Sequence, residues 1–155
     1  MFERFLVAVD GSPTADKALT YALELAKVRK AYVRALFIVD IPVAYVADVD
    51  PFPFIDAMRL QGESIRERTA QRLKGAAVEG DVEIREVMPI GGDVAHQINV
   101  AADEYQADVI VLGTHGRRGF RRLALGSVAE NCVRQARRPV ILVPSDPAEA
   151  VGDVP

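Results

Sequence analysis

Apolar residues gather in five short runs along the chain, and the segments between successive runs carry apolar residues three to four positions apart. The runs predict β-strands, and the helical spacing predicts a helix after each of the first four strands. Near-continuous apolar runs are typical of parallel strands that are buried on both faces. The predicted strands are 4–10, 31–40, 82–90, 107–112 and 138–144.

The segments between the runs contain the residue types that begin helices. Ser12 can cap the first helix, Pro13 suits its first position, and Asp93 can cap the third helix. Right-handed crossovers between parallel strands leave an open twisted sheet with helices on both faces as the natural arrangement. The sequence therefore predicts an α/β fold of the Rossmann-like class. The predicted helices are 13–29, 55–73, 94–105 and 128–136.

Two segments depart from this pattern. Residues 41–54 contain three prolines and three aromatic residues, which predicts an ordered or semi-ordered loop that either covers a site or is a connection without a role. The tail 145–155 is rich in proline, glycine and acidic residues, which is typical of disordered ends. We therefore expect a single domain over residues 1–144 and a flexible C-terminal tail.

The bulk composition fits one ordinary domain. The chain has 155 residues, of which 50% are hydrophobic and 26% are charged. No apolar run approaches the roughly 20 residues of a membrane-spanning helix, and the first residues, MFERFLVAVD, lack the pattern of a signal peptide. We therefore expect a cytoplasmic protein that is not associated with a membrane.

The charge and cysteine content narrow the possible functions. The formal net charge is −3, so the surface as a whole does not attract nucleic acid, and any anion site has to be local. The single cysteine, Cys132, rules out an internal disulfide and a cysteine-based metal site, and we expect it to pack in the core.

The one local concentration of positive charge lies in GTHGRRGFRRLALGS, residues 113–127, directly after the fourth strand. Its first three glycines allow backbone amides to converge on an anion, and Gly126 and Ser127 open a helix whose N-terminal amides favour negative charge. The loop therefore indicates a phosphate site. Three simpler interpretations stay open: the glycines only shape a turn, the arginines only contact solvent, and Ser127 only caps the helix.

Spacing excludes two other nucleotide motifs. A Walker loop needs a lysine before its final Ser or Thr, and no lysine lies between residues 75 and 155. A dinucleotide fingerprint needs three glycines after the first strand, where the chain has only Gly11. If the strand order reverses between the first and fourth strands, Asp10 faces the 113–127 loop across one crevice.

The pattern Gly113-x-x-Gly116, nine residues and then Gly126-Ser127 resembles the ATP-binding signature of the universal stress protein family. The similarity extends over nearly the whole chain, through VAVDGS, LFIVD, GGDVAHQI, ADVIVLGTHGRRG, LGSVAENCVRQA and RPVILVP. It implies a sheet in the order 3-2-1-4-5 and a homodimer that pairs the last strands edge to edge.

The resemblance also implies which residues contact ATP. Asp10 can accept hydrogen bonds from the ribose or the adenine, although it can instead serve as a turn residue that pairs with Ser12 or the helix start. His115 can donate to phosphate or only face solvent. On the adenosine side the implied contacts are Ala8, Asp10 and Ile38, and on the phosphate side they are Gly113, Thr114, His115, Gly116, Arg117, Arg118, Gly119, Gly126, Ser127 and Val128.

The sequence favours a nucleotide-dependent switch or partner-binding module over an enzyme. Phosphoryl transfer needs carboxylates that hold a metal near the γ-phosphate, and the loop contains no acidic residue, so we expect no catalytic residue and at most slow hydrolysis. Two alternatives remain. One is a weak ATPase or nucleotidyl transferase with Mg²⁺ near Asp10 or Asp40, and the other is a dimeric scaffold that binds no nucleotide.

Overall fold

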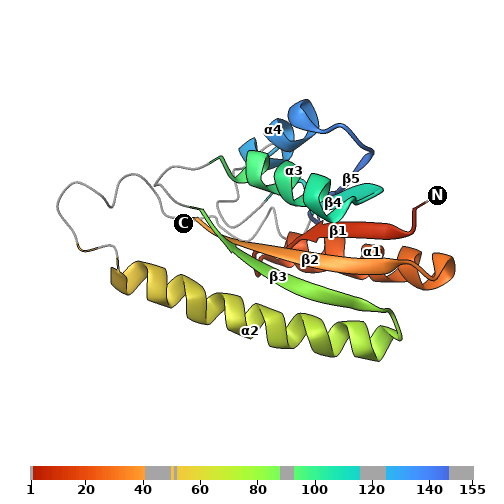
Figure 1. The fold of residues 1–155 in the computed structure, drawn as a ribbon, viewed down its shortest axis with the longest axis horizontal. Helices are drawn as coiled ribbons and strands as arrows, with labels where there is room; N and C mark the ends of the chain where they lie inside the picture. Colours follow the sequence, from red (N-terminus) through yellow and green to blue (C-terminus); the bar gives the residue numbers. More distant parts are fainter. Residues whose placement is uncertain (1, 41–49, 51, 88–92, 116–124, 147–155) are drawn as a thin grey trace.

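The computed structural model describes residues 2–40, 50, 52–87, 93–115 and 125–146. Five parallel strands form one sheet in the order β3-β2-β1-β4-β5, with helices on both faces (Figure 1). The α/β class predicted from the pattern and the strand order implied by the family resemblance are thus confirmed. The elements are β1 (Arg4–Ala8), α1 (Pro13–Arg29), β2 (Tyr32–Val39), α2 (Phe52–Ala76), β3 (Gly80–Glu86), α3 (Val94–Tyr105), β4 (Val109–Gly113), α4 (Ser127–Gln135) and β5 (Val140–Val143).

The strand order reverses between β1 and β4. β1 pairs with β2 on one side, where Ala8 lies opposite Leu36, and with β4 on the other, where Val7 lies opposite Val111. Because all these strands are parallel, the carboxyl ends of β1 and β4 lie side by side at one edge of the sheet. Open α/β sheets bind ligands at such a reversal.

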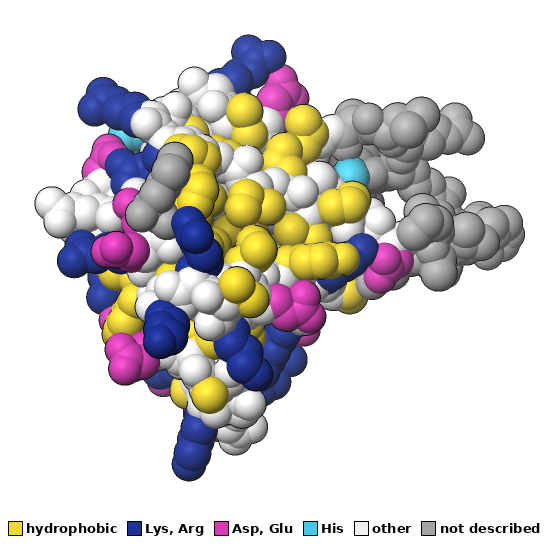
Figure 2. Space-filling view, turned by 90° about the vertical axis from the view of Figure 1, so that its right-hand side faces the viewer, with side chains coloured by type: hydrophobic (Ala, Val, Ile, Leu, Met, Phe, Trp, Pro, Cys, Tyr) yellow, Lys and Arg dark blue, Asp and Glu magenta, His cyan; other side chains and the backbone are white. Residues whose placement is uncertain are grey.

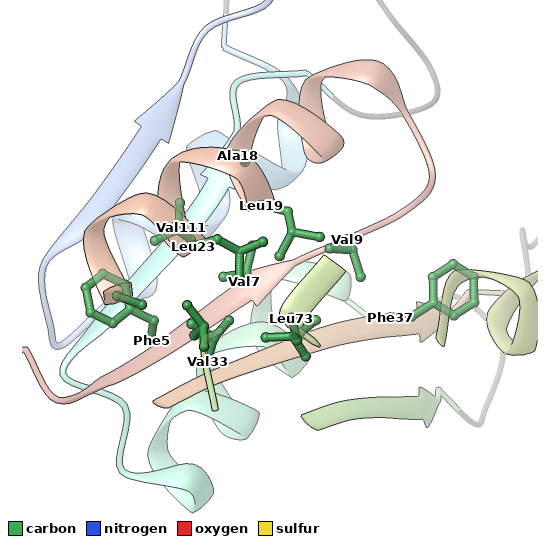
Figure 3. Packing of buried hydrophobic residues seen from close by; sticks show 14 of the residues in the cluster. Phe5, Val7, Val9, Ala18, Leu19, Leu23, Val33, Phe37, Leu73 and Val111 are labelled. Carbon is green, nitrogen blue, oxygen red and sulfur yellow. The ribbon is translucent and has the colours of Figure 1, made fainter. Parts of the chain in front are cut away.

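Each face of the sheet has its own hydrophobic core. Side chains of α1 and α2 pack on one face, and Figure 3 shows Leu19 and Leu23 of α1 close to Val7 and Val111 of the sheet. The opposite face packs against α3 and α4 through a second cluster that contains Ile98. Burial of both faces explains why the strands are apolar at nearly every position.

Two predicted helix caps are confirmed. The Ser12 hydroxyl accepts a hydrogen bond from the Ala15 amide at 3.2 Å at the start of α1, and Pro13 is the first helical residue. The Asp93 carboxylate accepts one from the Ala95 amide at 3.0 Å at the start of α3. Each cap satisfies an amide that has no partner within its helix.

Several element boundaries differ from the predicted ones, and the structure gives the reason for two of them. Helix α2 begins at Phe52, so the predicted loop over 41–54 is wrong at its end. The Asp50 carboxylate accepts a hydrogen bond from the Phe52 amide at 3.1 Å, and a proline in the first turn removes no hydrogen bond of the helix. Strand β3 begins at Gly80, two residues early, because Gly80 already pairs with Val33.

Other expectations stay predictions. Residues 41–49, 51, 88–92 and 147–155 lie outside the described part of the chain, and with them most of the predicted loop and tail. Asp146, near the start of that tail, forms an ion pair with Lys17 of α1 at 2.5 Å. Among the described residues, no helix is both long enough and apolar enough to cross a membrane.

Candidate functional site

The turn from β1 into α1 forms one wall of the candidate site. One oxygen of the half-buried Asp10 carboxylate accepts a hydrogen bond from the Ser12 amide at 2.8 Å. Gly11 between them has a φ of +81°, a left-handed conformation that favours glycine. Asp10 therefore does have the turn role that the sequence left open. A carboxylate accepts several hydrogen bonds, so this role is compatible with a ligand contact as well.

The end of β2 presents backbone groups toward the same region. The Val9 amide donates to the Leu36 carbonyl at 2.9 Å, and the paired register of β1 with β2 ends at Ala8 and Leu36. Successive residues of a strand direct their backbone amide and carbonyl to the strand on one side and then to the strand on the other. The Leu36 carbonyl points to β1, so the amide and carbonyl of Ile38, two residues later, also point to the β1 side, past the last paired residues. The Ile38 side chain is 7% exposed and packs against the α3 and α4 side, so only its backbone faces the edge.

The end of β4 lies against the first turn of α1. A Cβ on Gly113 would lie 2.6 Å from Cγ2 of Thr14, closer than real contacts allow. Packing inside the protein is therefore sufficient reason for a glycine at 113, whether or not a ligand approaches it. The same contact brings the start of α1 beside the end of β4. Sequence reasoning did not identify Thr14, because nothing local in the sequence indicates this contact.

Thr114 connects three elements at this edge. Its amide donates to the Val143 carbonyl of β5 at 2.9 Å, and its carbonyl accepts from the Gly126 amide at 2.8 Å. Its hydroxyl lies 3.0 Å from Nδ1 of His115, which is half-buried. The two ends of the glycine-arginine loop are thus joined at Thr114, next to the sheet.

The first turn of α4 begins at this junction. Its N-cap is Gly126, which has no side chain to accept a hydrogen bond, so the alternative that Ser127 caps the helix is wrong. Ser127 is the first helical residue, and both Ser127 and Val128 are exposed. A Cβ on Gly126 would lie 2.9 Å from the Thr114 carbonyl oxygen, so the junction also needs glycine here. A helix start without a side-chain cap leaves its first amides to other acceptors.

Four of the implied phosphate contacts lie outside the described residues: Gly116, Arg117, Arg118 and Gly119. The other contacts, from Ala8 to Val128, are all described and lie at the carboxyl ends of β1, β2 and β4 or at the start of α4. The described residues contain no cluster of three or more His, Cys, Asp or Glu side chains that could hold a metal ion.

Helix α4 packs on α3 through the buried Cys132 and through polar contacts. Cys132 is fully buried, as predicted, and its burial raises the pKa of the thiol to about 11 even though the Asn99 amide lies 3.7 Å from the sulfur. The Gln135 side chain donates to the Asp93 carboxylate at 2.8 Å, and this bond lowers the pKa of Asp93. These contacts hold the second half of α4 on α3.

Comparisons with known proteins agree with this architecture. The sequence model of the universal stress protein family matches residues 1–144. A universal stress protein of Methanocaldococcus jannaschii is 34% identical over 149 residues, covering 92% of this chain and 82% of that protein. A crystal structure of a universal stress protein family member from Burkholderia pseudomallei has a TM-score of 0.78 at 35% identity, covering 93% of this chain and 97% of that one.

Some more distant members have been solved with nucleotides. They include a family protein of Arabidopsis thaliana with AMP bound, with a TM-score of 0.69, 20% identity and coverage of 97% of this chain and 96% of that one. The universal stress protein of Archaeoglobus fulgidus in complex with dAMP has a TM-score of 0.67, 23% identity and coverage of 92% and 99%. At these identities the similarity shows the shared fold. The family match over residues 1–144 confirms the resemblance, and the chain belongs to the universal stress protein family.

Proposed function

We propose that this protein binds ATP at the carboxyl edge of β1 and β4 and acts as a nucleotide-dependent switch. The observation that carries the proposal is the junction at Thr114, which holds the uncapped start of α4 beside the end of β4. Backbone amides and the helix dipole at such a start favour phosphate oxygens. ATP would supply the negative charge, with Mg²⁺ neutralising part of it; the described acidic residues offer no separate metal cluster.

The adenosine end of the ligand would lie toward β1 and β2. In this proposal the Asp10 carboxylate accepts a hydrogen bond from the ribose or the adenine, and the Ile38 amide and carbonyl, which point toward β1, contact the adenine. Backbone groups can read an adenine edge without any special side chain, so an apolar residue at 38 agrees with this role. The relatives solved with AMP and with dAMP support an adenine nucleotide as the ligand class.

A homodimer that pairs β5 strands is the assembly we propose. β5 is an edge strand of the sheet, and its residues Val140, Ile141 and Leu142 are only partly buried. Figure 2 is viewed from the right-hand side of Figure 1, and it shows hydrophobic side chains gathered at the centre of this face of the protein. An exposed apolar edge favours pairing with a second copy. Helix α1, which packs partly on β5, exposes Tyr21, Leu25 and Val28.

Calorimetric titration with ATP, AMP and adenosine tests the assignment of each end of the site. Ser127→Ala should lower the affinity for ATP several-fold and leave the affinity for adenosine unchanged, because the hydroxyl is assigned to phosphate. Asp10→Asn should lower the affinity for all three ligands, because the carboxylate is assigned to the adenosine end. Gly75→Ala is the matched control, since a Cβ there meets nothing within 4 Å. If wild-type protein binds none of the three ligands, the proposal is wrong and the scaffold alternative stands.

A further inference from the structure

The first turn of α1 contains an amide that its own cap does not use. The Ser12 hydroxyl accepts from the Ala15 amide at 3.2 Å, and the Ser12 carbonyl accepts from the Asp16 amide at 3.0 Å. Pro13, the first helical residue, has no amide hydrogen to donate. For the Thr14 amide, the described part of the chain offers no acceptor. A helix start leaves such an amide to a partner from outside the helix.

The Thr14 hydroxyl also lacks a partner, although the residue is only 6% exposed. It makes no hydrogen bond to any residue that the structure describes. No side-chain oxygen in these parts of the chain is both fully enclosed and without a partner, so the hydroxyl lies in the small accessible part of Thr14. Polar groups in buried positions nearly always have a partner. An open hydroxyl on an almost fully buried residue therefore indicates a place for a group from outside the chain.

The Thr14 side chain faces the carboxyl edge of the sheet. Each Cα–Cβ bond of a helix tilts toward the helix N-terminus, and α1 starts at this edge, five residues after the end of β1. The three atoms nearest to the Cβ position of Gly113 all belong to Thr14, and the closest is Cγ2 at 2.6 Å. The hydroxyl is the other branch on the same Cβ. Thr14 thus presents two donors beside the end of β4.

Two helix starts meet at the end of β4. On one side Gly113 lies against Thr14 of α1, and on the other the Thr114 carbonyl accepts from the Gly126 amide at 2.8 Å, where α4 begins. Helices α1 and α4 pack on opposite faces of the sheet, so their N-terminal ends approach β4 from both sides. The positive ends of two helix dipoles at one place favour an anion between them.

We propose that the Thr14 hydroxyl and amide bind a phosphate oxygen of the nucleotide, opposite the start of α4. This inference rests on the proposed function and adds a residue outside the contacts that the family resemblance implies. Phosphate fits because both Thr14 groups can donate, and hydrogen bonds to a charged oxygen are the stronger ones. The adenosine end lies toward β2 in this arrangement, so Thr14 distinguishes nucleotides from adenosine.

Calorimetric titration of Thr14→Val and Thr14→Ser separates the hydroxyl from the packing of the methyl group. Valine keeps the shape of threonine without the hydroxyl, so the affinity for ATP should fall on the order of tenfold, as for one lost hydrogen bond to a charged group. The affinity for adenosine should stay unchanged. Serine keeps the hydroxyl and should retain most of the ATP affinity. Thr69→Val is the matched control and should change neither affinity, since Thr69 is an equally buried threonine of α2, outside the proposed site.

The outcomes separate this inference from the proposed function. If Thr14→Val binds ATP as tightly as wild type, the inference is wrong and the proposed function stands. The inference is also wrong if the serine variant loses as much ATP affinity as the valine variant, or if Thr14→Val loses adenosine affinity equally. Should Thr14→Val not fold, Thr14→Ala against Thr14→Ser makes the same comparison. If wild type does not bind ATP, the proposed function fails and the inference fails with it.

Discussion

The close approach of β4 to α1 at Gly113 predicts a substitution that a local view of the loop would treat as harmless. In Gly113→Ala the new Cβ would lie 2.6 Å from Cγ2 of Thr14 and 3.2 Å from its Cβ and carbonyl carbon. Both segments belong to packed elements, so one of them has to shift. Overpacking of this kind costs about 1–3 kcal/mol of the free energy of unfolding. The shift would also move the start of α1 away from β4, so ATP affinity should fall as well.

A double-mutant cycle identifies the contact responsible. Thr14→Ser removes the methyl group that Gly113→Ala would meet first, at a cost of about 0.8 kcal/mol for the buried carbon. In the double variant the alanine should cost at least about 0.5 kcal/mol less than it does alone, a coupling of the size found between residues in contact. Urea denaturation with an unchanged slope measures these differences.

Gly75 lies inside α2, and a Cβ there meets nothing within 4 Å, so Gly75→Ala should be neutral or stabilise the protein by up to about 1 kcal/mol. If Gly113→Ala is as well tolerated as Gly75→Ala, the packing reason for Gly113 is wrong. If it destabilises the protein equally with serine and with threonine at position 14, the strain arises from another contact.

Three further predictions concern stability, reactivity and assembly. Asp93→Ala should cost about 0.5–2 kcal/mol, because it removes the cap of α3. The Gln135 bond lowers the pKa of Asp93 below its ordinary value of 3.8. The Asp93 carboxylate therefore stabilises the protein fully above pH 3.8, and this stabilisation is lost as the pH falls through the lower pKa of the folded state. The free energies of unfolding of wild type and Asp93→Ala should converge in acid unfolding experiments. Cys132 should resist alkylation at pH 8 in the native state and react in urea, because burial raises its pKa to about 11; rapid labelling of the folded protein would show that α4 opens readily. Ile141→Lys should give monomers in sedimentation, and a dimer that persists would place the interface elsewhere.

Much of the fold follows from local patterns in the sequence. The five apolar runs and the caps at Ser12 and Asp93 are local signals, and the strands and helices are found where these signals predict them. The prediction sets the start of α2 too late, because Phe52 and Pro53 have the composition of a loop. The Asp50 carboxylate that supports this start is recognisable only once the helix is known.

The candidate site shows the limit of local reasoning more clearly. The spacing of glycines singles out residues 113 and 126 as ligand contacts, which stays a prediction, and the contacts that require glycine there come from Thr14 and from the Thr114 carbonyl. The first of these contacts joins residues about a hundred positions apart, so no local pattern predicts it. Ser127 was a candidate cap because serine favours that position. The helix begins one residue earlier than that interpretation requires, since Gly126 bonds to Thr114.

The most direct test of the central claim is to denature the freshly purified protein and identify any nucleotide released by mass spectrometry, quantified against the protein. The account predicts an adenine nucleotide approaching one per chain, or uptake of one Mg·ATP per chain by protein purified empty. Protein that releases no nucleotide and takes up no Mg·ATP would contradict it and would leave the junction at Thr114 as a purely structural turn.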